Sequence, residues 1–218
     1  MMTSRVAVHE KPILFSGPMV RAILEGRKTQ TRRVIKPQPP SGSSLHQPEL
    51  YAPVVIDRDG IEQPGAEIFG VYTEDGEWGV KCPYGRPGDR LWVRETFLKF
   101  DQSHWPPKYG YKADTLGPDF EESEQARKDL GYKWRPSIFM PRAASRLDLE
   151  VLGVRVERIQ EISSEGAMDE GVYKKIDQPA NSFLPIPAFR ELWDSINAKR
   201  GFAWESNPWV WVVEFRKL

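Results

Sequence analysis

The sequence predicts a mainly β protein with a few short helices (α+β), in which a small curved sheet or barrel forms the core. Two long segments, 145–159 and 209–216, alternate their side chains with the period of a β-strand. The 17 glycines and 19 prolines make up one residue in six, which favours short elements joined by many turns. A regular succession of strands and helices is absent, so we do not expect a doubly wound parallel sheet. The 218 residues fit a single domain, 1–218.

The first 36 residues predict a strand, a helix and a second extended segment. A short apolar strand is expected at 12–16, followed by a helix with Pro18 at its first position. Apolar residues recur on one face of this helix up to Leu24, and Gly26 suits the left-handed position that ends a helix. Residues 29–35 then read as an extended segment that stops at a proline.

The middle of the chain is rich in turns and holds weaker signals. Residues 37–50 have the composition of a loop, and a clearer strand covers 90–97. Residues 101–133 are polar, contain a short helix at 120–130, and are predicted to be an insertion rather than part of the core. Weaker strand signals lie at 53–56, 67–72 and 78–81.

The last third predicts the most regular elements. The long alternating strand at 145–159 slips at Gly153, which indicates a β-bulge. A short helix at 162–170 has Ser163 as its cap, and an amphipathic helix is expected at 187–198. The final strand, 209–216, is the most apolar segment of the chain.

Composition excludes several classes of protein. Hydrophobic residues are 39% and charged residues 28%, which is typical of a folded globular chain. The longest uncharged apolar run spans only 209–213, whereas a membrane helix needs about twenty residues. Residues 1–11 carry charges and no apolar signal-peptide core. We therefore expect a cytoplasmic protein with no membrane association; the sequence does not define its protein partners.

Cysteine and histidine usage argues against a structural metal. The single cysteine, Cys82, excludes an internal disulfide and is expected to be a small hydrophobic side chain, either buried or partly exposed. The three histidines are far apart and have no zinc-binding spacing. No metal and no cofactor are expected.

The charges balance at 31 basic and 31 acidic residues, but they are segregated. Residues 21–36 carry six cations and one acid, and 133–146 carry four cations and no acid, whereas 57–77 carry seven acids and one base. A neutral protein of this kind can present a positive face to phosphate groups. Solvated surface charge is the alternative explanation.

Residues 26–33, GRKTQTRR, offer a chemical pattern beyond a basic helix end. Lys28 and Thr31 are close enough in sequence to share one small site, and the neighbouring cations would lower the pKa of the lysine. A lysine with a lowered pKa can take a proton from a hydroxyl, which makes threonine a nucleophile. Cations at a helix C-terminus also stabilise the helix dipole, which is the purely structural explanation of the same residues.

Four segments in order resemble the ASCH family: GRKTQTRR after a short helix, GDRLWVRET at 88–96, a short helix ending at 169–171, and the terminal strand WVWVVEF. The resemblance implies a PUA-like β-barrel associated with RNA, with insertions near 37–80 and 100–133. The longer form, with CPYG, WRPSIFMPR and NPWVWV, resembles the variant found in phages and prophages.

Small bacterial members of this family are amidohydrolases that remove the acetyl group from acetylated cytidine, and this chain is similar to them at three positions. The resemblance implies that Thr31 is the nucleophile, that Lys28 is the base that activates it, and that Glu170 orients or protonates. Each role suits amide hydrolysis without a metal. Other members act on single-stranded RNA as ribonucleases, so the fold leaves the reaction open.

A further set of residues is predicted to contact nucleic acid through phosphate pairing or base stacking. These residues are Arg27, Arg32, Arg33, Trp92, Arg94, Arg142 and Arg146. The structural alternatives are packing of Trp92 and Arg94 beneath a loop and simple solvation of Arg142 and Arg146. Three hypotheses remain: a metal-independent hydrolase of a modified nucleoside or RNA, a single-stranded RNA-binding module or ribonuclease, and a phage accessory protein without catalysis.

Overall fold

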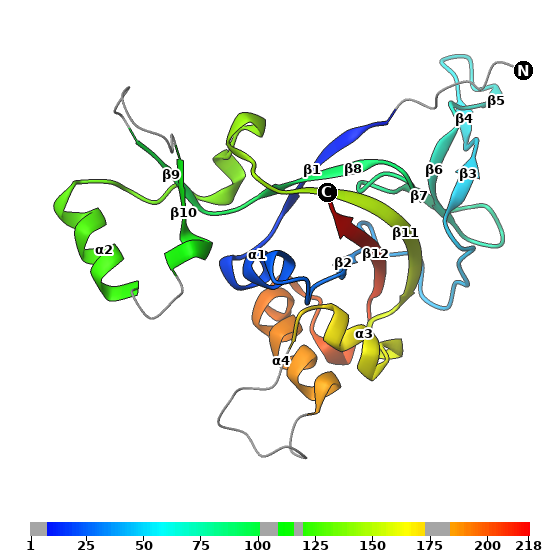
Figure 1. The fold of residues 1–218 in the computed structure, drawn as a ribbon. Helices are drawn as coiled ribbons and strands as arrows, with labels where there is room; N and C mark the ends of the chain where they lie inside the picture. Colours follow the sequence, from blue (N-terminus) through cyan, green and yellow to red (C-terminus); the bar gives the residue numbers. More distant parts are fainter. Residues whose placement is uncertain (1–7, 101–108, 116–119, 173–183) are drawn as a thin grey trace, which may run out of the picture.

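The computed structural model of the protein describes residues 8–100, 109–115, 120–172 and 184–218. Its centre is a strongly curved five-stranded sheet (Figure 1), which confirms the mainly β class with short helices. One pair, β1–β8, is parallel, and the other neighbouring strands are antiparallel. In spatial order the strands are β1 (Glu10–Leu14), β8 (Arg90–Arg94), β11 (Asp148–Arg158), β12 (Trp209–Lys217) and β2 (Gln30–Val34).

In the described part of the chain this sheet is open, with β1 and β2 as its two edges. The two edge strands β1 and β2 follow each other in the sequence, with α1 (Gly17–Leu24) between them. β1 pairs with β8 and β2 pairs with β12, so strand pairing does not close the expected barrel.

The long pair β11–β12 lies within the sheet and confirms the predicted bulge. Its register shifts between Val151 and Gly153, where one extra residue fits into β11. Alternate residues of β12 enter two different hydrophobic clusters: Trp211 packs on one side and Val210 and Val212 pack on the other. The unbroken apolar run of β12 therefore reflects burial of both faces of this strand.

The helices α1, α3 (Ser164–Asp169) and α4 (Pro185–Asn197) all lie below the sheet in the view of Figure 1, but they pack in different clusters. α1 belongs to the cluster that contains Trp211, whereas α3 and α4 belong to the cluster that contains Val210 and Val212. Gly26 has a φ of 74° after α1, and the Ser163 hydroxyl accepts a hydrogen bond from the amide of Gly166, as the sequence predicts. Phe189 and Trp193 of α4 pack against the face of β12 that bears Val210 and Val212.

Smaller β units extend from opposite ends of the main sheet (Figure 1). One end carries the sheet β3 (Glu49–Tyr51), β6 (Ile68–Tyr72) and β7 (Gly79–Lys81), and the hairpin β4 (Val54–Ile56) and β5 (Glu62–Pro64). The other end carries β9 (Phe97–Lys99), β10 (Tyr109–Tyr111) and α2 (Phe120–Asp129). The 3₁₀ helices are η1 (Lys112–Thr115), η2 (Ser137–Phe139), η3 (Arg142–Ala144), η4 (Ile159–Glu161), η5 (Ala198–Arg200) and η6 (Trp204–Ser206).

Three expectations from the sequence need correction. The loop predicted at 37–50 contains the start of β3, because Glu49 pairs with Gly70. The strand predicted at 90–97 ends at Arg94, and Phe97 pairs instead with Tyr111. The segment 101–133 also contributes to the main core through buried Ala113; its residues 101–108 and 116–119 lie outside the described part.

None of the helices in the described ranges is both long and apolar enough to cross a membrane.

Cys82 provides a direct test of this packing. Its side chain is buried in the main core, and burial raises the pKa of the thiol to about 11. We expect the folded protein to react with an alkylating reagent at pH 8 far more slowly than the protein unfolded in guanidinium, because the thiolate is the reactive form. Mass spectrometry of timed samples measures both rates; rapid labelling of the folded protein would contradict the buried position.

Candidate functional site

The turn after α1 places Lys28 against the end of α3. The backbone amides of Arg27 and Lys28 both donate to the carbonyl of Ala22, and Lys28 forms an isolated antiparallel bridge with Glu170. Glu170 is the C-cap residue of α3, so its side chain leaves the helix end beside β2. Two residues that lie 142 positions apart in sequence thus meet at one point.

The ammonium group of Lys28 is buried and has three acceptors. Nζ donates to Glu170 Oε2 at 2.7 Å, to the Glu170 carbonyl at 2.9 Å and to the Gln30 carbonyl at 2.9 Å. Three acceptors satisfy the three protons of an ammonium group. Burial lowers the pKa of Lys28, and the Glu170 carboxylate opposes this shift.

The second carboxylate oxygen of Glu170 extends the cluster to Arg32. Glu170 Oε1 lies 3.3 Å from Arg32 Nη1, and Arg32 Nε donates to Glu157 Oε1 at 2.7 Å. Gln30 completes the set, because its amide group donates to Asp169 at 2.9 Å. The cluster alternates cations and carboxylates, as buried charges require.

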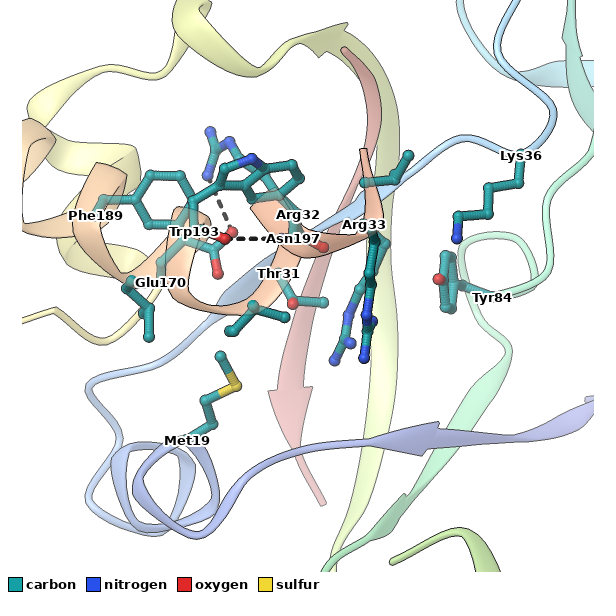
Figure 2. A pocket seen from close by; sticks show the side chains of 14 residues that line it. Met19, Thr31, Arg32, Arg33, Lys36, Tyr84, Glu170, Phe189, Trp193 and Asn197 are labelled. Atoms are coloured by element: carbon teal, nitrogen blue, oxygen red, sulfur yellow. Dashed lines mark hydrogen bonds and ion pairs between the residues drawn. The ribbon is translucent and has the colours of Figure 1, made fainter. Parts of the chain in front are cut away.

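A pocket of about 280 Å³ lies beside this cluster between β2, α1 and α4. In Figure 2, Glu170, Phe189 and Trp193 lie on one side, Arg33, Lys36 and Tyr84 lie on the other, and Thr31 lies between them. The other lining residues are Met19, Arg32, Val34, Leu192, Ile196, Asn197 and Arg200. A carboxylate and a threonine hydroxyl therefore share one concave site with an aromatic wall and a cationic wall.

Of the three predicted catalytic residues, Thr31 and Glu170 line this pocket and Lys28 does not. The ammonium of Lys28 instead contacts the Glu170 carboxylate that lines the pocket. Lys28 also borders a second hollow of about 460 Å³, although its side chain is fully buried. The expected convergence is direct for Thr31 and Glu170 and indirect for Lys28.

The predicted nucleic-acid contacts within the GRKTQTRR stretch fall into different environments. Arg32 and Arg33 line the pocket, but Arg32 is held by Glu157 and Glu170. Arg27 donates from Nε to Glu25 at 2.8 Å and from Nη1 to the Gly171 carbonyl at 3.3 Å. Only Arg33 of this group both lines the pocket and is held by no carboxylate in the described ranges.

Trp92, Arg94 and Arg142 form a separate group on the outer part of the sheet. The guanidinium groups of Arg94 and Arg142 lie 5.4 Å and 5.9 Å from the ring centre of Trp92. Arg142 is also ion-paired with Glu10 at 3.1 Å. This group is not part of the pocket lining, so the structure does not bring it together with Thr31.

Arg146 is a structural residue in this arrangement. Its Nε lies 2.9 Å from Glu95 Oε1, and its Nη1 lies 2.9 Å from Asp114. The guanidinium also lies 4.0 Å from the ring centre of Tyr111. Arg146 is therefore ion-paired through the same guanidinium that was expected to meet phosphate.

Several pocket residues were not predicted from the sequence as functional: Met19, Lys36, Tyr84, Phe189, Trp193, Asn197 and Arg200. Phe189 and Trp193 belong to the apolar face of the predicted helix at 187–198, which indicates packing and gives no sign of a site. Lys36 follows β2 within the same basic run, and it is the residue whose role the charge pattern could have signalled.

No group of three or more His, Cys, Asp or Glu side chains capable of holding a metal occurs among the residues that the structure describes. The donors at the pocket are hydroxyl, amide, guanidinium and ammonium groups with one carboxylate. A scan against protein-family models and searches of curated proteins and of solved structures find no match to this chain.

Gly171 tests how closely α3 must approach Lys28. Its φ is 88°, and a Cβ added there would lie 3.0 Å from Ala22 Cβ and 3.1 Å from Lys28 Cβ. Gly201 has a φ of 84° with open space around the added Cβ, so it is a matched control. We expect Gly201→Ala to lose about 1 kcal/mol of unfolding free energy from backbone strain. Gly171→Ala should lose clearly more, measured by urea denaturation; equal losses would contradict the close contact.

The Lys28–Glu170 pair predicts non-additive stabilities. Glu170→Gln leaves a buried ammonium with only carbonyl partners, and we expect it to lose about 3–5 kcal/mol of unfolding free energy. Lys28→Met should lose a similar amount because Glu170 keeps only Arg32. The double variant should be much more stable than the sum of the single losses predicts. Urea titrations of the four proteins give the coupling energy, and a value near zero would contradict a direct pair.

Proposed function

We propose that this chain is an ASCH-type protein of PUA-like fold, in which the curved sheet takes the place of the barrel. Its pocket hydrolyses the amide of an acylated cytidine or of a related modified nucleoside, either within RNA or as the free nucleoside. The observation that carries the proposal is the buried Lys28–Glu170 ion pair beside a pocket that Thr31 and Glu170 share. A buried ion pair beside a concave site is typical of catalytic sites, where the pKa values of acids and bases are shifted to suit proton transfer.

The chemistry follows from these groups. The Thr31 hydroxyl attacks the acyl carbon, and its proton passes to a base as the C–O bond forms. The tetrahedral intermediate then breaks its C–N bond. The amino group of the nucleobase takes up the proton held by the catalytic base and leaves. Water hydrolyses the acyl-threonine ester and restores the hydroxyl, releasing the carboxylic acid.

The Lys28–Glu170 pair supplies the base in this scheme. Burial lowers the pKa of Lys28, so its neutral form is more accessible than in water. The 2.7 Å contact between Nζ and Oε2 lets the carboxylate that lines the pocket exchange a proton with the amine behind it. In this arrangement Glu170 touches the substrate side, and Lys28 sets its protonation.

The test is hydrolysis of an acylated cytidine followed by mass spectrometry. Thr31→Ala should lower the rate by more than about 10³-fold because the nucleophile is gone. Thr29→Ala is the control, since Thr29 is a neighbouring threonine outside this pocket. Lys28→Arg should also be inactive, because guanidinium stays protonated.

Activity of the unsubstituted protein should rise with pH through an apparent pKa below the usual lysine value of about 10.4, since the base must lose its proton. Full activity of Thr31→Ala would reject the nucleophile role.

A second candidate function, binding of single-stranded RNA with or without strand cleavage, is favoured by one observation. The ammonium of Lys28 is already satisfied by three acceptors, which stabilises the protonated form and opposes a role as base. A ribonuclease can use the 2′-hydroxyl of its substrate as nucleophile. In that case Thr31→Ala would retain most of its RNA cleavage, whereas amide hydrolysis would be absent in every variant.

A further inference from the structure

The two ends of the pocket differ in charge balance. At one end the charge of the Glu170 carboxylate is balanced by two cations, with Oε2 on Lys28 and Oε1 on Arg32. At the other end lie Arg33 of β2, Lys36 just after β2, and Arg200 at the end of η5. In the ranges that the structure describes, no carboxylate is ion-paired with any of these three cations. The pocket therefore carries an uncompensated positive charge at one end.

Arg33 is the most informative of the three cations. Its Nη2 donates to the Leu14 carbonyl and its guanidinium lies 5.0 Å from the ring centre of Phe15, but its buried Nε has no hydrogen-bond partner. Burial lowers the pKa of Arg33; Tyr84 and Glu170 oppose this shift, and the positive charge of Arg200 adds to it. A buried guanidinium with an unused donor is unfavourable unless an acceptor arrives from outside.

The neighbouring groups favour an oxygen-rich anion in this place. Lys36 Nζ lies 5.0 Å from the ring centre of Phe202, a contact that leaves its protons free for an acceptor. Burial also raises the pKa of Tyr84, so this residue lines the same end as a neutral hydroxyl that can donate a hydrogen bond. Guanidinium and ammonium groups that line one pocket are suited to phosphate recognition.

We propose that Arg33, Lys36 and Arg200 form a phosphate subsite, so that the pocket takes a nucleotide in preference to a free nucleoside. This inference rests on the proposed function for the identity of the base. Figure 2 gives the geometric reason: Thr31 lies between the cationic side and the side with Glu170, Phe189 and Trp193. A phosphate held at the cationic end directs the base toward the aromatic wall and its acyl group toward Thr31.

Binding, measured without turnover, tests the subsite separately from the reaction. Isothermal titration of the Thr31→Ala protein with cytidine, 5′-CMP, 3′-CMP, ribose 5-phosphate and a short single-stranded RNA compares the ligands directly. We expect a CMP to bind at least about tenfold more tightly than cytidine, because charge-assisted hydrogen bonds contribute that much. The preference should fall as salt rises. Tighter binding of the RNA than of either CMP identifies a chain phosphate as the natural ligand, and equal or weaker binding identifies a mononucleotide.

Arg200→Gln should reduce the preference for CMP over cytidine by about tenfold and leave the affinity for cytidine unchanged. Lys199→Gln is the matched control. It removes the same charge at the adjacent residue, and Lys199 does not line the pocket. Arg33→Met should have the same effect as Arg200→Gln. If Arg33→Met fails to fold, Arg200→Gln still tests the proposal, because Arg200 is exposed.

Equal affinities for CMP and cytidine, no binding of either, or equal loss in Lys199→Gln and Arg200→Gln would overturn the subsite. Ribose 5-phosphate binding as tightly as CMP would overturn the nucleotide assignment. The two proposals fail separately. Tight CMP binding without amide hydrolysis would reject only the hydrolase, and hydrolysis of free acylated cytidine without a phosphate preference would reject only the subsite.

Discussion

The need to satisfy a buried ammonium group organises the functional half of this protein. Lys28 is excluded from water, so its three protons must find acceptors within the fold, and they find the carbonyl of Gln30 and two oxygens of Glu170. These contacts fix the start of β2 relative to the end of α3. The Glu170 carboxylate, held on its other side by Arg32, is thereby fixed at the edge of the pocket. Removing one partner would leave the other as a buried, unpaired charge.

The second organising element is β12, whose two faces serve two different parts of the molecule. Trp211 belongs to the main core under β1, β8 and β11, whereas Val210 and Val212 support Phe189 and Trp193 of α4. The aromatic wall of the pocket is therefore the back of a packed hydrophobic cluster, which holds it in one position. The cationic wall is built differently, from polar side chains whose charges the described residues do not neutralise.

The sequence predicted the main elements well because their signals are local. The Gly26 turn, the Ser163 cap, the Gly153 bulge and the final strand all depend on a few neighbouring residues. The short strands β5 and β10 were missed because three residues that include a proline or a central glycine have little strand propensity. The ion pairs of Arg146 gave no signal because its partners, Glu95 and Asp114, are distant in sequence. Arg200 gave no signal for a different reason: a cation at the end of a helix is expected for its dipole alone.

The position of β12 in the sheet also has a consequence for the order of assembly. β2 is synthesised early, yet its sheet partner is β12, with Arg32 opposite Val212 across about 180 residues. Until β12 leaves the ribosome, β2 has no sheet partner, because the folded sheet pairs it with β12 alone. Closing so long a loop is entropically unfavourable and slow. The pocket is consequently a late product of folding, and a ribosome-bound chain lacks it even after α1 and the β3–β6–β7 sheet have formed.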